Sequence, residues 1–299
     1  MARWPALFAL LLAGHALAAG PDPAAGEYLF HAAGCANCHT DREHGGAPLA
    51  GGRKLATPLG DFYTPNITPD PDTGLGRWTE ADFRRALREG RGPDGRHYYP
   101  SFPYAAYTRL SDADIGALWA YLKTVPPVRQ ANRPHALPWY LQSRPLLAGW
   151  KRLYFHPGSY VPDPRKDAVW NRGAYLVQAV GHCAECHTPR NKLGGFRIGM
   201  YLAGDRAGVE GGLVPNITPD KATGIGRWSR GELIDYLKTG MRPDGDSAGG
   251  LMAEVIDNGL SHLTPQDIDA IAAYVQSVPP VAHAVRQPRP APAQDGFEY

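Results

Sequence analysis

Two copies of a short cysteine–histidine motif constrain the fold of this chain more than any other feature. The copies are Cys35-Ala36-Asn37-Cys38-His39 and Cys183-Ala184-Glu185-Cys186-His187. All four cysteines of the 299-residue chain lie in them, so none is left for a disulfide framework. Two thiols with two residues between them match the spacing of the two vinyl groups of a haem, and the adjacent histidine then reaches the iron. The motifs therefore predict two covalently attached haem c groups. The predicted thioether residues are Cys35, Cys38, Cys183 and Cys186, and the predicted proximal iron ligands are His39 and His187.

Zinc binding and thiol redox chemistry are the alternative uses of such motifs. Zinc ribbons also pair two Cys-x-x-Cys units, and a redox-active pair can be followed by a histidine. Here 148 residues separate equivalent positions of the two copies. That separation suits two haem domains better than one zinc site.

The two motifs occupy corresponding places of an internal repeat. The repeated segments are Pro-Asn-Ile-Thr-Pro-Asp at 65–70 and 215–220, Thr-Gly-x-Gly-Arg-Trp at 73–78 and 223–228, and Pro-Asp-Gly at 93–95 and 243–245. Each half also ends in Val-Pro-Pro-Val. The repeat predicts two homologous domains, residues 22–126 and 168–281.

Both domains are predicted to be mainly α-helical. Helices are expected before each haem motif, after each Thr/Ser-x-x-Asp/Glu capping box, and at the end of each domain. The expected helices are 26–33, 79–90 and 111–124 in the first domain and 172–180, 229–240 and 264–277 in the second. A first and a last helix packed beside a haem, which supplies much of the apolar core, form a small class I-like cytochrome c domain. The predicted fold is two such domains in tandem.

The segments outside the domains carry further expectations. Residues 1–19 have the features of a secretory signal peptide, namely Arg3, an apolar run too short to span a bilayer, and a small-x-small site at Ala16–Ala18. The mature chain is therefore expected in the periplasm, soluble or peripherally attached to a membrane. Residues 127–167 are rich in Pro, Arg and aromatic residues, and they are predicted to form an ordered linker that packs across both domains and fixes the haem–haem geometry. The Pro/Ala-rich stretch 282–299 is predicted to be a disordered tail.

The repeat also allows the sixth iron ligands to be compared. Met252 lies seven residues after Gly245, in a glycine-rich loop before the last helix. The equivalent position after Gly95 is Phe102. Because a thioether sulfur is a natural axial ligand, Met252 is the predicted distal ligand of the second haem. Met241 is the competing methionine, and a methionine that only fills the core is the other alternative.

The first haem needs a different ligand, because phenylalanine cannot bind iron. His97, five residues before Phe102 in the same loop, is the predicted distal ligand. His31 lies on the proximal side of the motif, and His44 follows the motif in a polar loop. The alternatives are that His97 caps a turn or contacts a haem propionate, and that this haem stays open or water-bound. Unequal ligand sets would give the two haems unequal potentials, and so a direction to electron flow.

In their order, and in both halves, these segments resemble the di- and tri-haem cytochrome c family. That family includes the cytochrome subunits of bacterial membrane-bound alcohol and gluconate dehydrogenases, which carry methionine where Phe102 lies. In this chain the corresponding segment, residues 99–104, is Tyr-Pro-Ser-Phe-Pro-Tyr. The sequence resembles a two-haem branch of the family that has His and Phe at the positions of His97 and Phe102. The resemblance supports Met252 as a ligand. It implies periplasmic electron transfer from a partner dehydrogenase towards quinone, an oxidase or another cytochrome. Those subunits usually carry a third haem domain, which this sequence lacks.

The sequence favours an electron carrier over a catalyst. A net charge of +2 without a run of Lys or Arg speaks against nucleic-acid binding. The expected function is electron relay between redox proteins, in which the haem does the chemistry and the protein sets potential and access. The rival is a dihaem enzyme that oxidises thiosulfate or reduces peroxide at an open or labile first haem. No catalytic acid/base pair stands out beside that haem, although His97 can serve as one.

Overall fold

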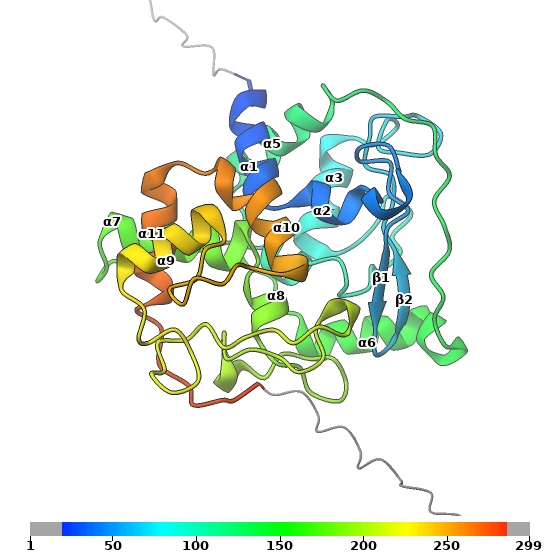
Figure 1. The fold of residues 1–299 in the computed structure, drawn as a ribbon. Coiled ribbons are helices and arrows are strands. Elements are labelled where there is room, and N and C mark those ends of the chain that lie inside the picture. The colour runs from blue at the N-terminus through cyan, green and yellow to red at the C-terminus, as the bar shows by residue number, and fades with distance from the viewer. Residues whose placement is uncertain (1–19, 286–299) are drawn as a thin grey trace, which may run out of the picture.

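The computed structural model describes residues 20–285 of the chain (Figure 1). The predicted signal peptide, 1–19, and residues 286–299 of the predicted tail lie outside the described residues. Over the part that is described, no helix combines the length and the apolar character needed to cross a bilayer.

The described chain is mainly helical, as predicted, with one small sheet. The helices are α1 (Pro23–Ala32), α2 (Cys35–His39), α3 (Glu80–Glu89), α4 (Tyr104–Tyr107), α5 (Asp112–Leu122), α6 (Arg144–Tyr154), α7 (Ala168–Tyr175), α8 (Ala184–His187), α9 (Arg230–Thr239), α10 (Gly250–Asn258) and α11 (Pro265–Val275). The strands are β1 (Lys54–Thr57) and β2 (Gly60–Tyr63), which pair antiparallel.

The first and last helices of each half pack together, as expected. Helix α1 lies against α5 and helix α7 against α11 (Figure 1). A Cβ atom added to Gly26 would lie 2.0 Å from the carbonyl oxygen of Ala117, and one added to Gly173 would lie 1.9 Å from that of Ala270. Glycine is therefore required at both crossings, because neither backbone can move aside in a close-packed core.

The capping boxes place the middle helices where the sequence predicts them. The side chains of Thr79 and Asp82 bond each other's backbone N–H at the start of α3, and Ser229 and Glu232 do the same for α9. Both helices end at a glycine in the left-handed region, as the sequence indicates. The same local signals set the limits of both helices, so these limits recur in both halves.

The helix before the second haem motif differs from the single predicted helix. After α7 the chain forms a π-turn over Leu176–Val180. The crossing glycines, Gly26 and Gly173, are 147 residues apart, whereas Cys35 and Cys183 are 148 apart. The π-turn accommodates this one extra residue without moving the helix crossing or the motif.

The β1–β2 hairpin was not predicted from the sequence, and it binds the linker. The backbone N–H and carbonyl of Asp61 pair with those of Ala136. Leu137 packs with Leu55 and Phe62 in a small separate cluster. The hairpin thus holds the start of the linker against the first domain.

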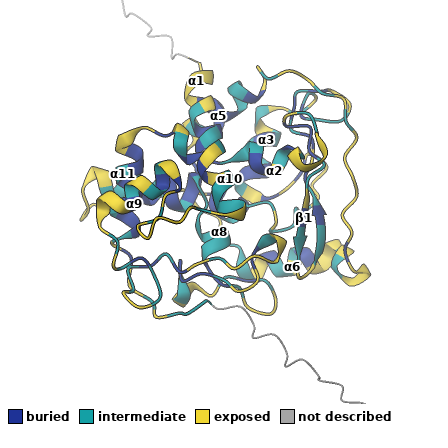
Figure 2. Cartoon of the chain, in the orientation of Figure 1, coloured by how far each residue is buried: buried dark blue, intermediate teal, exposed yellow. Residues whose placement is uncertain are grey.

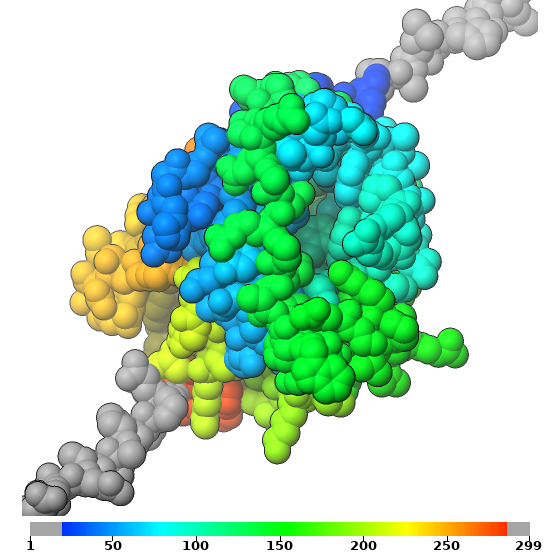
Figure 3. Space-filling view, turned by 90° about the vertical axis from the view of Figure 1, so that its right-hand side faces the viewer, coloured from blue at the N-terminus to red at the C-terminus, as the bar shows by residue number. Residues whose placement is uncertain are grey.

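The linker contacts residues of both halves, and Figure 3 shows it running across the face of the molecule. The indole N–H of Trp150, in α6, donates to the carbonyl of Leu193 in the second half. The backbone N–H of Tyr160 donates to the carbonyl of Arg109 in the first half. Several of its apolar residues are nevertheless exposed, including Trp139 at 84%. Figure 2 shows exposed residues along the linker helix α6.

One continuous hydrophobic core runs through both halves. It joins residues of α1 and α5 to residues of α7, α9 and α11. The halves also exchange equivalent hydrogen bonds. The Tyr28 hydroxyl donates to Asp267 at 2.6 Å, and the Tyr175 hydroxyl donates to Asp114. Because each half gives a tyrosine from its first helix to an aspartate of the other's last helix, the halves are related by an approximate two-fold axis.

The carboxylate of Asp267 should make folding pH-dependent. Burial raises its pKa, but hydrogen bonds from Arg172 and Tyr28 outweigh burial and lower that pKa below the usual carboxyl value. The contribution of Asp267 to the free energy of unfolding is complete above about pH 4, the pKa that its carboxyl has in the unfolded chain. This contribution is lost as the pH falls towards the lower pKa of the carboxyl in the folded protein. In urea unfolding at pH 7 and pH 3, Asp267→Asn should be less stable at pH 7 and less sensitive to acid than wild type. An unchanged pH slope would contradict this assignment.

Candidate haem sites

Each cysteine motif forms a short helix, and one of its thiols packs against the hydrophobic core. The motifs occupy α2 and the turn that leads into α8, and all four thiols are free of disulfides. Within residues 20–285, no three or more His, Cys, Asp or Glu side chains are grouped so as to hold a metal ion. The donor set of two thiols and one imidazole per motif fits a covalently attached haem.

The histidine of each motif is held in the tautomer that iron binding requires. The Nδ1 atom of His39 lies 2.7 Å from the carbonyl oxygen of Pro65, and that of His187 lies 2.9 Å from the carbonyl oxygen of Pro215. A carbonyl only accepts, so Nδ1 carries the proton and Nε2 keeps its lone pair. Burial also lowers the pKa of both histidines, which favours the neutral ring. Both rings are therefore prepared to bind a metal through Nε2.

The repeated Pro-Asn-Ile-Thr-Pro-Asp segment supplies these carbonyl groups. Asn66, 2% exposed, anchors the first copy by donating from Nδ2 to the Thr73 hydroxyl at 3.0 Å and to the Val128 carbonyl at 2.7 Å. Its Oδ1 accepts from the backbone and the hydroxyl of Thr68. Sequence reasoning used this segment only as evidence of the repeat and missed its contact with the histidine, for which the repeated Pro–Asn pair is the signal.

The second copy of this segment makes the same contacts and offers a test. Asn216 donates to the hydroxyl of Thr223 at 3.0 Å and to the carbonyl of Val281 at 2.8 Å. Asn216→Ala should lower the free energy of unfolding by about 2 to 3 kcal/mol, because buried partners lose their bonds. Exposed Asn191→Ala is the control, and chemical denaturation measures both. Equal stabilities of the two variants would show that the asparagine is no anchor.

The structure separates the two candidate methionines of the second domain. Met252 lies in the first turn of helix α10 rather than in the loop that the sequence indicates, half-buried against the core that Cys35 and Cys183 both contact. Met241 is 52% exposed and follows α9. A ligand inside a haem pocket must be shielded from water, so Met252 is the better placed of the two.

Aromatic side chains surround the equivalent position in the first domain. The ring of Phe102 lies 5.8 Å from that of Tyr98, 5.7 Å from that of Tyr107 and 6.4 Å from that of Tyr104. Burial raises the pKa of Tyr98 to about 12 and also raises the pKa values of Tyr104 and Tyr107. Burial therefore favours the protonated form of all three phenols. The hydroxyl of Tyr104 is buried without a hydrogen-bond partner.

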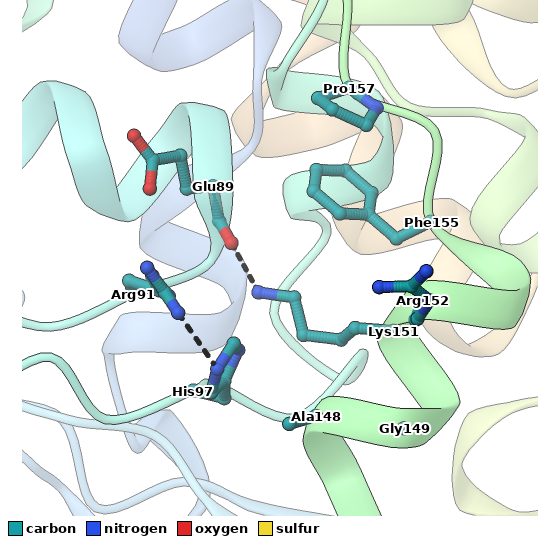
Figure 4. Close-up of a pocket in the computed structure, with 9 residues that line it drawn as sticks. All are labelled: Glu89, Arg91, His97, Ala148, Gly149, Lys151, Arg152, Phe155 and Pro157. Carbon is teal, nitrogen blue, oxygen red and sulfur yellow. Dashed lines mark hydrogen bonds between the residues drawn. The ribbon is translucent and has the colours of Figure 1, made fainter.

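His97 lines a pocket of about 830 Å³ beside α6 (Figure 4). Its Nε2 atom lies 3.2 Å from Nη2 of Arg91, which donates, so Nδ1 carries the proton. Lys151 and Arg152 line the same pocket, whereas the residues of the first motif do not. The structure therefore does not bring His97 together with Cys35–His39, and coordination would require the ring to leave Arg91.

A family model described as cytochrome c matches residues 23–126 and 171–279. The chain belongs to the cytochrome c family. It is 45% identical over 259 residues to a diheme cytochrome c-type protein of Cereibacter sphaeroides, with 86% of each chain covered. The two cytochrome c regions and this relative show that the chain carries two covalently bound haem c groups. The resemblance found in the sequence is confirmed.

Longer relatives are named as cytochrome subunits of dehydrogenases. The cytochrome c subunit of a gluconate 2-dehydrogenase from Pantoea cypripedii is 41% identical over 262 residues, or 85% of this chain and 58% of its own length. The cytochrome subunit of a fructose dehydrogenase from Gluconobacter japonicus is 43% identical over 268 residues, or 88% of this chain and 54% of its own length. The chain thus spans little more than half the length of these relatives.

The second domain packs directly against the cysteine motif of the first. Helix α10 of the second domain packs against α2 of the first, near the centre of the molecule (Figure 1). Arg53 joins them, because it donates to the Asn37 carbonyl at 2.6 Å and pairs with Glu254 at 2.5 Å. Burial, the Glu185 carboxylate and the sulfur of Cys38 raise the pKa of the Cys186 thiol to about 11.

Proposed function

We propose that the chain is a periplasmic dihaem cytochrome that relays electrons from a partner dehydrogenase towards the respiratory chain. The observation that carries the proposal is that both haem motifs pack against one continuous core, which Cys35 and Cys183 both contact. This shared core favours electron transfer between the two haems of one molecule over two haems that work independently. Bound haem supplies reversible one-electron chemistry, and the polypeptide sets its potential and access.

The proposed roles of the residues follow from the two sites. Cys35, Cys38, Cys183 and Cys186 form the thioethers, and His39 and His187 are the proximal ligands. Met252 is the proposed distal ligand of the second haem, where its sulfur raises the potential. His97 remains the predicted distal ligand of the first haem, although its ring faces Arg91 in the structure.

The partners and the location are proposed from the relatives and from the N-terminus. The cytochrome subunits of gluconate and fructose dehydrogenases support a dehydrogenase as the donor. A quinone, an oxidase or another cytochrome would accept the electrons. The signal-peptide features of residues 1–19 support export to the periplasm, with the protein soluble or peripherally attached. The domain limits 22–126 and 168–281 and the tail 282–299 are proposed on the same sequence grounds.

A dihaem enzyme is the second candidate, and one observation favours it. Phe102 and its tyrosine neighbours provide no strong ligand, and His97 faces elsewhere. A first haem without a distal ligand would be open to peroxide or thiosulfate.

Stopped-flow mixing of the purified full-length protein separates the two functions. A carrier should be reduced rapidly by the catalytic subunits of a fructose dehydrogenase that lack their own cytochrome subunit. It should show no catalytic turnover of hydrogen peroxide when reduced, and none of thiosulfate when oxidised. If the protein turns over either compound and is not reduced by the dehydrogenase, it is an enzyme and not an electron carrier.

A further inference from the structure

His182 immediately precedes the second haem motif, yet its side chain contacts the first domain. Its Nε2 atom lies 3.1 Å from the carbonyl oxygen of Ala33, two residues before Cys35. The carbonyl only accepts, so Nε2 donates the proton. The imidazole also packs edge-on against Tyr107 of the first domain, with ring centroids 5.5 Å apart. One side chain therefore connects the backbones that lead into the two motifs.

The backbone of His182 adopts a conformation that side-chain-bearing residues rarely use. Its φ is +40°, in the left-handed region. The repeat places Gly34 at the equivalent position of the first motif, with a φ of +60°. Glycine takes this conformation freely, whereas histidine is strained in it. The second domain thus has a histidine at the position where the first has glycine. The backbone turn itself does not require an imidazole side chain.

The other interdomain bonds described above contact at most one motif, as Arg53 does by bonding the Asn37 carbonyl and Glu254. The Tyr28–Asp267 and Tyr175–Asp114 pairs join first helices to last helices. They hold the domains together without contacting either cysteine motif. Among the contacts described above, that of His182 with Ala33 lies nearest in sequence to the attachment points of both haems.

We propose that His182 is a positioning residue that ties the second haem motif to the backbone before the first and so fixes the separation and orientation of the two haems. This role rests on the proposed function, because a relay needs a constant haem–haem geometry. Without the imidazole, the turn into Cys183 would remain but its link to Ala33 would be lost.

The test is the distance distribution between the two ferric haems, measured by pulsed EPR on the oxidised full-length protein. His182→Gly should fold, since it reproduces the residue found at position 34, and it removes only the side chain. Its distribution should be broader than that of wild type. Tyr28→Phe is the matched control, because it removes an interdomain bond remote from the motifs and should leave the distribution narrow.

A wild-type distribution in His182→Gly would overturn the proposal, as would equal broadening in Tyr28→Phe. If the glycine variant does not take up both haems, His182→Asn carries the test. Asparagine tolerates positive φ but is too short to reach Ala33 from the same backbone, so a broader distribution is expected and an unchanged one contradicts the proposal. The measurement needs no partner or substrate, so its outcome is independent of whether the protein proves to be a carrier or an enzyme.

Discussion

A Met252→Ala variant is expected to lower the reduction potential of one haem by on the order of 100 mV, a fraction of the roughly 0.8 V over which axial ligands set haem potentials. The reason is that a thioether sulfur stabilises the reduced iron, and alanine offers no replacement. The potential of the other haem should stay near its wild-type value, because its predicted ligands lie in the first domain. Spectroelectrochemical titration of the full-length protein resolves the two haems.

Met241→Ala is the matched control for this change. Met241 belongs to the same domain but is 52% exposed, so both potentials should remain as in wild type. If the reduction potential of one haem falls in the Met241 variant but not in the Met252 variant, then Met241 and not Met252 is the distal ligand. No change in either would remove methionine ligation from the second haem.

Gly173→Ala is expected to reduce the free energy of unfolding by about 3 kcal/mol, at the upper end of what overpacking costs. The added methyl group would lie 1.9 Å from the carbonyl oxygen of Ala270, where α7 crosses α11. A backbone carbonyl in a helix cannot move aside without displacing the helix. Chemical denaturation followed by circular dichroism measures the loss.

Gly231→Ala controls for the general effect of replacing a helical glycine. Gly231 lies in the first turn of α9, and no atom lies within 4 Å of a Cβ added there. This variant should be as stable as wild type or slightly more so, because alanine favours the helix. Equal destabilisation of the two variants would mean that the α7–α11 crossing is not close-packed.

The local features of the fold could be predicted from the sequence. The cysteine motifs specify their cofactor because the spacing of the thiols is set by covalent chemistry within five residues. The helices that follow Thr79 and Ser229 start and end at signals next to them in the chain. The contrast between Met252 and Phe102 was visible because the repeat aligns the two halves.

Contacts between distant segments could not be predicted in the same way. The Tyr28–Asp267 bond joins residues 239 positions apart, and no pattern in one sequence pairs them. The direction of the His97 ring depends on the packing of α6, which carries the pocket residues Lys151 and Arg152. The role of His182 depends on a backbone angle that only the folded chain reveals. The positions of these side chains thus depend on long-range packing, which sequence periodicity and motif spacing do not specify.

Time-resolved photoreduction tests most directly whether the two haems form an internal relay. One electron is delivered to the oxidised full-length protein, and its redistribution between the haems is followed optically at several protein concentrations. The account predicts a first-order process whose rate does not depend on concentration, because both motifs share one core. A rate that rises in proportion to protein concentration would show that electrons pass only between molecules, and it would contradict the relay.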